Sequence, residues 1–224
     1  YPFTTEFSQL NSCDFIEKIL YNELRVKKLI VGYDHHFGKD RQGNLEILRN
    51  CANPFGFDII KVDALEDKGK KISSSRIRNL ILEGAIEKAN TYLNYEYFIT
   101  GSVIKGDQLG RKLGFPTANI QIVEDEKLIP KRGVYAVKIS IESLEYNGML
   151  NIGTRPTVSS KTETNIEVHI FNFSGDLYDK NLNIKFIKFI RNEIKFSDKA
   201  QLRERLVTDK EIALKVLRDY RPAK

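Results

Sequence analysis

Residues 101–119 read GSVIKGDQLGRKLGFPTAN. Within this stretch, three glycines alternate with three cationic side chains: Gly106, Gly110 and Gly114, with Lys105, Arg111 and Lys112. Glycine lets a backbone turn tightly and bring its N–H groups close to an anion, and cations add charge at the same place. We therefore expect this loop to bind phosphate groups. A glycine-rich hairpin with solvated lysines is the alternative that the residues alone leave open.

Thr117 and Asn119 follow directly, two residues apart on an extended segment after Pro116. Residues at this spacing can face the same side, and proline fixes the backbone φ angle just before them. Their neutral oxygens suit a Mg²⁺ ion held on phosphates, although a turn in which both side chains satisfy backbone groups is the alternative. The stretch as a whole indicates phosphoryl transfer.

The glycine spacing differs from that of the common phosphate loops. A P-loop needs Gly-x-x-x-x-Gly-Lys-Ser/Thr and a dinucleotide fingerprint needs Gly-x-Gly-x-x-Gly, and residues 106–114 match neither. The charges between the glycines exclude a membrane-helix dimer motif.

Residues 106–119 closely resemble the signature of riboflavin kinases. The resemblance runs from about residue 97 to the C-terminus. Further segments that are similar to this family follow in order: residues 151–158, 167–171, 175–178 and 189–196. The resemblance implies a six-stranded barrel that uses ATP and riboflavin to make FMN. It implies that Thr117 and Asn119 hold the Mg²⁺ of MgATP, and that Arg191 and Phe196 lie on the flavin side.

Glu167 is the candidate general base. From its position alone it reads as an exposed strand glutamate, with a side chain that alternates away from Ile166 and Val168. The resemblance of residues 167–171 to the catalytic segment of the family assigns it the base role instead. His169, on the same strand face, we interpret as a hydrogen-bonded structural histidine. Arg191 either faces the ligand or pairs with Glu193, and the sequence does not decide between them.

The beginning of the chain is similar to bacterial bifunctional FAD synthetases, in which an FMN adenylyltransferase precedes a riboflavin kinase. The similarity covers residues 29–43 and 72–78. It implies a nucleotide site that includes Gly32 and Asp34, together with the run Ser73, Ser74, Ser75 and Arg76. The family usually has Thr where this chain has Ser75, and the hydroxyl is retained.

The His-x-Gly-His segment that opens this domain in the family does not occur in the sequence. The chain starts at Tyr1, and its one methionine is Met149. We therefore expect the latter part of a longer protein, with an incomplete FMN adenylyltransferase domain in residues 1–92 and a riboflavin kinase domain in residues 93–224. Loss of the first strand would remove half of the ligand crevice. Adenylyl transfer is expected in the full-length protein and lost or very weak in this chain.

Hydrophobic periodicity predicts two kinds of architecture. The first part reads as an incomplete Rossmann-like α/β sheet, with parallel strands near 27–31 and 57–62 and helices after Ser12, near 43–52 and after Ser73. The second part reads as a mainly antiparallel β-barrel, with strands near 98–104, 133–141, 144–152, 166–173 and 182–190. Ser197 is expected to cap a short C-terminal helix and Thr208 with Glu211 to cap a second one.

The charged segment 67–71 between the two parts has two readings. It is a solvated connection or a lid that approaches phosphate, and the resemblance slightly favours the lid. Cys13 and Cys51 stand alone and suit a reducing compartment as buried or incidental thiols. His35 and His36 lack the further ligands of a convincing zinc site.

The formal net charge of +6 permits either nucleic acid or small anions as ligands. The basic residues are scattered along the chain, so ATP and flavin phosphates suffice as partners, and we expect no nucleic acid, no membrane and a cytoplasmic location. Two other hypotheses stay open. One is retained adenylyl transfer, and the other is a basic β-barrel that binds single-stranded nucleic acid through Tyr95, Tyr97 and Phe98.

Overall fold

The computed structural model describes residues 2–106, 110, 113–124, 126–155 and 163–221. The chain divides into two compact units, residues 1–72 and residues 73–224, and each is described by itself. The boundary at residues 92 and 93 that the resemblance suggested concerns family segments, and it stays a prediction. The two helices between these boundaries belong to the second unit.

The first unit is a small α/β unit whose two main strands run parallel. Its elements are α1 Thr5–Ser8, α2 Ser12–Asp14, the π-helix η1 Phe15–Glu23, β1 Lys28–Gly32, the 3-10 helix η2 Lys39–Arg41, α3 Leu45–Ala52, the 3-10 helix η3 Asn53–Phe55, β2 Asp58–Val62, β3 Glu66–Asp67 and β4 Lys70–Lys71. β1 pairs with β2 in parallel, as predicted, and Val31 of β1 packs with Ile16, Leu48 and Phe57 in the core. The charged segment 67–71 forms part of the β3–β4 hairpin.

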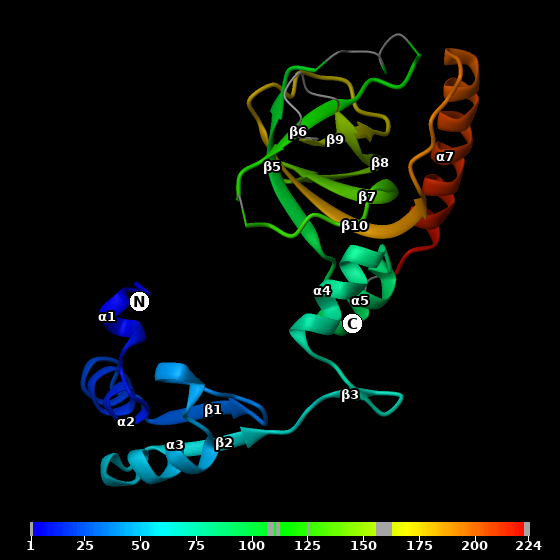
Figure 1. Cartoon of the computed structure of the whole chain (residues 1–224). Helices are drawn as coiled ribbons and strands as arrows, with labels where there is room; N and C mark the ends of the chain where they lie inside the picture. The colour runs from blue at the N-terminus through cyan, green and yellow to red at the C-terminus, as the bar shows by residue number, and fades with distance from the viewer. Residues whose placement is uncertain (1, 107–109, 111–112, 125, 156–162, 222–224) are drawn as a thin grey trace. The chain divides into compact units, whose positions relative to one another are not determined.

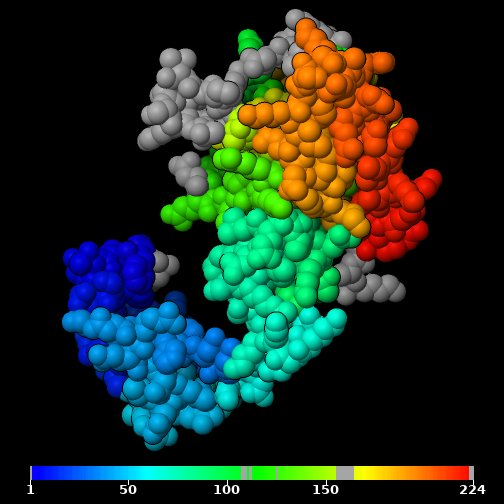
Figure 2. All heavy atoms as spheres, turned by 45° about the vertical axis from the view of Figure 1, so that its right-hand side comes forward, coloured from blue at the N-terminus to red at the C-terminus, as the bar shows by residue number. Residues whose placement is uncertain are grey.

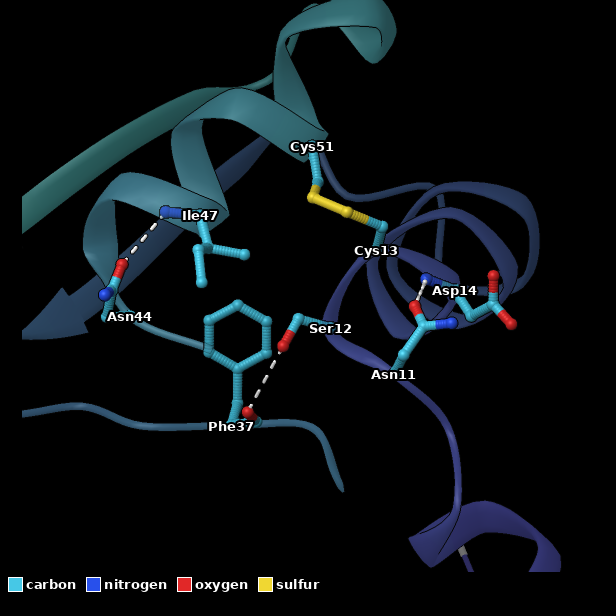
Figure 3. Close-up of a disulfide and its surroundings, with 8 residues drawn as sticks. All are labelled: Asn11, Ser12, Cys13, Asp14, Phe37, Asn44, Ile47 and Cys51. Carbon is cyan, nitrogen blue, oxygen red and sulfur yellow. Dashed lines mark hydrogen bonds between the residues drawn. A yellow bond between two sulfur atoms is a disulfide. The ribbon is translucent and has the colours of Figure 1, made fainter. Parts of the chain in front are cut away.

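Cys13 and Cys51 form a disulfide between α2 and α3 (Figure 3), with their Cα atoms 5.2 Å apart. The interpretation of these cysteines as separate thiols was therefore wrong, and Cys13 is exposed rather than buried. Asn11 and Asn44 cap the two helices by accepting hydrogen bonds from backbone N–H groups (Figure 3). Two capped helices hold the cysteines at bonding distance, which the sequence separation of 38 residues did not reveal.

The second unit contains a closed six-stranded antiparallel barrel (Figure 1). Its strands follow the order β10-β5-β6-β9-β8-β7 around the barrel. Its elements are α4 Ser74–Glu83, α5 Ile86–Leu93, β5 Phe98–Ile104, β6 Ala118–Ile122, β7 Gly133–Ile141, β8 Leu144–Arg155, β9 Glu163–Ile170, β10 Asn181–Arg191 and α7 Lys199–Asp219. The barrel confirms the architecture that the resemblance implied. β6 is a strand where we expected only an extended segment.

Alternating side chains fill the barrel interior. Tyr135, Val137 and Ile139 of β7 point into the main core, whereas Ala136 packs in a second cluster outside it. α4 and α5 contribute Ile81, Ile86 and Ala89 to the main core. Ser73 caps α4 as predicted, because its hydroxyl accepts a hydrogen bond from the Arg76 N–H.

α7 packs against the outside of β7, β8 and β10 through Ala213 and Leu217 (Figure 1). Its atoms, in orange-red and red, lie on the surface of this unit (Figure 2). The prediction of two C-terminal helices was wrong, because residues 199–219 form one helix. Asp198, not Ser197, is its N-cap. The Thr208 hydroxyl donates to the Glu204 carbonyl one turn earlier, so it caps nothing. The segment contains neither glycine nor proline that would interrupt it.

None of the helices in the described ranges has the length and apolar character that crossing a membrane requires.

Candidate functional site

Five residues from five neighbouring strands form one row around the barrel wall. Asn119 of β6 stands opposite Glu167 of β9, which stands opposite Asn151 of β8. Asn151 in turn faces Val134 of β7, and Val134 faces Arg191 of β10. Residues directly opposite in antiparallel strands project to the same face. All five line one cavity of ≈ 300 Å³.

The wall of this first cavity is mostly apolar. It includes side chains from the loop before β6, from β8, from the segment after β10 and from α7: Leu113, Phe115, Met149, Leu150, Ile194, Phe196, Leu202 and Leu206. An apolar cavity with a few convergent polar groups is typical of small-molecule sites. Phe196, predicted to lie on the flavin side, is part of this wall.

Glu167 lies between Asn119 and Asn151 in this row. The side-chain amide of Asn165 donates a 2.8 Å hydrogen bond to its Oε1 atom. Asn165 precedes Glu167 by two residues on β9, so both side chains share one face. One carboxylate oxygen is therefore held by Asn165, and Glu167 lines the first cavity.

A second cavity of ≈ 770 Å³ adjoins the same strands. Its lining consists of Val103, Ile104, Gly106, residues 116–119, Val168, Ile170 and residues 173–178. Thr117 and Asn119 belong to the walls of both cavities. The two predicted Mg²⁺ ligands are thus neighbours of Glu167, at the place where a ligand in one cavity would meet a ligand in the other.

Two of the predicted glycines approach these ligands closely. A Cβ atom on Gly106 would lie 1.9 Å from Nδ2 of Asn119, and one on Gly110 would lie 2.3 Å from the carbonyl oxygen of Phe115 and 3.1 Å from Oγ1 of Thr117. A side chain at either position would displace its neighbour. Glycine here makes room for the Thr117–Asn119 segment, a role that the phosphate-loop interpretation did not include.

Of the three cations in the predicted phosphate loop, the structure describes Lys105. Lys105 is exposed, and neither cavity lining includes it or Gly114. Arg111 and Lys112 lie outside the described residues. The N–H groups of Leu113 and Phe115 both donate to the Gly110 carbonyl, so they are already bonded. Phosphate binding by this loop stays a prediction.

Arg191 is fixed by a carboxylate that the sequence did not indicate. Its Nε and Nη2 atoms bond the carboxylate of Asp209 in α7 at 2.6–2.9 Å, and Arg205 bonds the same group at 3.1 Å. Its carboxylate partner in the described part of the chain is therefore Asp209 rather than Glu193. The Arg191 guanidinium also lies 5.9 Å from the ring centroid of Phe196. This contact ties the cavity wall after β10 to α7.

His169 is buried beside the site and bonds a backbone carbonyl. Its Nδ1 atom lies 2.7 Å from the carbonyl oxygen of Pro116. Burial lowers the pKa of the imidazole, an effect that the Pro116 bond opposes and the nearby Lys210 charge reinforces. The interpretation of His169 as a hydrogen-bonded histidine is confirmed.

The described residues contain no group of three or more His, Cys, Asp or Glu side chains that would hold a metal ion. A Mg²⁺ ion carried on phosphates needs few protein ligands, and neutral oxygens satisfy it. The Thr117 hydroxyl and the amide of the buried Asn119 provide such oxygens on a shared cavity wall. This donor set fits Mg²⁺ that arrives with a nucleotide.

The predicted residues of the nucleotide site upstream fall into different units. Gly32 ends β1, and Asp34 is exposed in the turn that follows, at the carboxyl end of a parallel strand where such sheets bind ligands. Ser73 caps α4, and the Arg76 guanidinium lies 4.9 Å from the ring centroid of Tyr92. Ser74 and Ser75 are exposed on the first turn of α4.

Sequence reasoning missed Asn151, Asn165 and Asp209. The period-two spacing from Glu167 was a usable signal for Asn165. Asn151 was noticed only as the start of a loop similar to the riboflavin kinases, but residues 151–155 belong to β8. Asp209 reaches the site only because α7 packs on the barrel, which no local pattern specifies.

Comparisons with known proteins divide the chain in two. A family model described as riboflavin kinase matches residues 93–217, and a model described as FAD synthetase matches residues 1–76. Three curated relatives carry the name bifunctional riboflavin kinase/FMN adenylyltransferase. The Buchnera aphidicola protein is 42% identical over 217 residues, which cover 95% of this chain and 69% of that protein. The Listeria monocytogenes protein is 40% identical, with 87% and 61% covered, and the Escherichia coli protein is 35% identical, with 92% and 66% covered.

A solved structure described as a macrolide-efflux protein from Streptococcus pneumoniae is also similar. It has a TM-score of 0.86 and 32% sequence identity, and it covers 98% of this chain and 68% of that one. The chain thus spans about two thirds of the length of the proteins it matches. None of these matches supports the nucleic-acid alternative.

Proposed function

Because the chain belongs to the bifunctional riboflavin kinase/FMN adenylyltransferase family, we propose that its barrel transfers the γ-phosphoryl group of ATP to the 5′-hydroxyl of riboflavin. The products are FMN and ADP. The observation that carries this proposal is the position of Glu167 between Asn119 and Asn151, in an apolar cavity whose wall also contains Thr117.

Riboflavin would occupy the first cavity and the nucleotide the second. The apolar wall with Phe115 and Phe196 suits a flat aromatic ring. Thr117 and Asn119, which line both cavities, would hold the Mg²⁺ of MgATP where the γ-phosphate meets the flavin hydroxyl. When bound, Mg²⁺ offsets the charge that develops on the phosphoryl oxygens.

Glu167 would accept the proton of the riboflavin hydroxyl during transfer. An alcohol is a poor nucleophile at neutral pH, and a positioned base contributes roughly 10²–10⁴-fold to the rate. Asn165 holds one oxygen of Glu167 at 2.8 Å, and we assign proton acceptance to the other oxygen. Arg191 already forms an ion pair with Asp209. We therefore assign Arg191, together with Phe196, to shaping the flavin side of the cavity rather than to neutralising the charge of the phosphoryl group.

The remaining roles rest on the family alone. They are phosphate binding by Lys105, Arg111, Lys112 and the backbone of Gly106, Gly110 and Gly114, and nucleotide binding by Gly32, Asp34 and residues 73–76. Adenylylation of FMN to FAD is proposed for the whole protein, and its loss in this chain stays a prediction. Small molecules as the partners and a cytoplasmic location are proposed as well.

The experiment is incubation of this chain with riboflavin, ATP and Mg²⁺, followed by chromatographic separation of the flavins. The parent chain should form FMN. Glu167→Gln should slow FMN formation by roughly 10²–10⁴-fold while riboflavin binding survives. Glu142→Gln, at an exposed residue in the β7–β8 turn, is the matched control. Near-normal turnover of Glu167→Gln would remove Glu167 from the mechanism.

Two other results of this experiment would change the functional assignment. FAD in addition to FMN would show that the first unit retains adenylyl transfer. If folded protein forms neither product, strongly salt-dependent binding of a single-stranded oligonucleotide would favour the nucleic-acid alternative.

A further inference from the structure

The ladder between β6 and β9 includes Asn119 and stops just before Thr117, the other candidate Mg²⁺ ligand. Its register pairs are Asn119 with Glu167 and Ala118 with Val168. Thr117 and, before it, Pro116 precede β6, and Pro116 has no N–H group to donate to a ladder. His169 is the next residue on β9, and its side chain bonds the Pro116 carbonyl at 2.7 Å. A side chain thus takes over where the backbone pairing ends.

The His169 imidazole is held in one orientation by its neighbours. Its ring centroid lies 5.4 Å from that of Phe115 and 5.5 Å from that of Phe171, both in edge-on geometry. The side chain is only 6% exposed. Because a carbonyl oxygen only accepts hydrogen bonds, Nδ1 is the nitrogen that carries the proton.

This bond acts on the one free backbone angle before Thr117. The ring of Pro116 fixes its φ angle, whereas its ψ angle remains free to rotate. Rotation about ψ would swing the carbonyl and the following peptide, and with them Thr117. A hydrogen bond to the carbonyl fixes that angle. Pro116 restricts its φ angle and His169 restricts its ψ angle, so together they hold the peptide before Thr117 in one orientation.

We propose that His169 is a positioning residue for nucleotide-bound Mg²⁺: its bond to the Pro116 carbonyl sets the orientation of Thr117 and Asn119. The proposal rests on the proposed kinase function, because it assigns the metal of MgATP to these two side chains. His169 itself touches neither the metal nor the reacting atoms. It acts through the backbone of residues 116–119.

Two substitutions separate this role from a merely structural one. His169→Leu keeps an apolar group between the phenyl rings but removes the donor. His169→Asn restores a donor, because the asparagine Nδ2 atom takes the place of the imidazole Nδ1 atom. Folding of each variant is checked by circular dichroism and thermal unfolding before any binding is measured.

The readout is MgADP binding to the full chain by isothermal titration calorimetry, with riboflavin binding measured in parallel. We expect His169→Leu to weaken MgADP binding about five- to tenfold, the equivalent of one lost hydrogen bond, and to raise the half-saturating Mg²⁺ concentration for FMN formation. His169 also lines the first cavity, but the lost bond acts on the segment 116–119, so riboflavin affinity should fall less than MgADP affinity. His169→Asn should recover most of the MgADP affinity.

Two results would overturn the proposal. One is a folded His169→Leu variant that binds MgADP as tightly as the parent chain. The other is an equal loss of MgADP and riboflavin binding in both variants, which indicates a general structural role. If the parent chain makes no FMN, the proposed kinase function fails, and the MgADP titration still decides the role of His169.

Discussion

Arg191 at the end of β10 and Asp209 in the middle of α7 form a bidentate ion pair, with three N–O distances of 2.6–2.9 Å. Asp209 is fully buried, and the Arg191 side chain is 12% exposed. Both residues line the cavity that contains Glu167. The pair therefore fastens the helix that supplies Leu202 and Leu206 to the strand that ends at the site.

Replacement of Asp209 by alanine should destabilise the barrel unit by about 3 kcal/mol, because it leaves the Arg191 guanidinium largely buried without its counter-charge. We take the low end of the range for buried pairs because the second partner, Arg205, is 34% exposed. Urea unfolding followed by circular dichroism measures the change. The exposed pair Lys180–Glu142 is the control, and Glu142→Gln should cost less than about 1 kcal/mol. Equal effects of the two substitutions would contradict this reading of the ion pair.

Gly106→Ala should impair the proposed kinase through Asn119. The new Cβ atom would lie 1.9 Å from Asn119 Nδ2 and 2.5 Å from its Cγ atom, so the amide must move. We expect MgADP affinity to fall about tenfold or more, which is the loss expected when one hydrogen bond to a charged group is removed. Isothermal titration calorimetry measures it.

A double-mutant cycle tests whether Asn119 carries this effect. In the Asn119→Ala background the clash is absent, so Gly106→Ala should add little further loss, and the two changes should be strongly non-additive. Additive losses would mean that Gly106 acts on the nucleotide independently of Asn119.

Much of the fold was predictable from the sequence. Residues 133–141 alternate in a way that specifies a strand, and residues 133–141 are β7. Ser73 stands before a helical apolar pattern and does cap α4. The resemblance, rather than periodicity, gave the number of barrel strands. β6 was missed as a strand because it is only five residues long and begins two residues after Pro116.

The candidate site was predictable where its residues lie close in the sequence. Thr117, Asn119 and Glu167 were named from motifs, and the register of β6 with β9 brings them to one cavity. Asp209 depends on long-range packing of α7. The Thr208 and Glu211 pattern was misleading, since a capping box and two positions on one face of a continuous helix have the same spacing.

The disulfide makes a prediction for the first unit. Removal of the link by Cys13→Ser should lower the stability of this unit by up to about 4 kcal/mol, the chain-entropy estimate for a loop of this length. Thermal unfolding of the full chain, with and without a thiol reductant, measures the change. Reductant should lower the unfolding temperature of the parent chain and leave that of Cys13→Ser unchanged. Labelling of two thiols in the denatured, unreduced parent would show that the bond does not form.

The stability of the barrel unit should fall on mild acidification because of His169. Its pKa is lowered from the usual value of 6.5, mainly by burial, so the folded state binds the proton less readily than the unfolded state. The contribution of the neutral ring to stability is full above pH 6.5. It declines as the pH falls towards the folded-state pKa, by at most about 1.4 kcal/mol per pH unit.

Urea unfolding of the parent chain and of His169→Asn at pH 7.5 and 5.5 gives the test. The groups common to both proteins cancel in the comparison, and the parent should lose more stability between the two values. An equal loss in both proteins would show that His169 does not resist protonation in the folded chain.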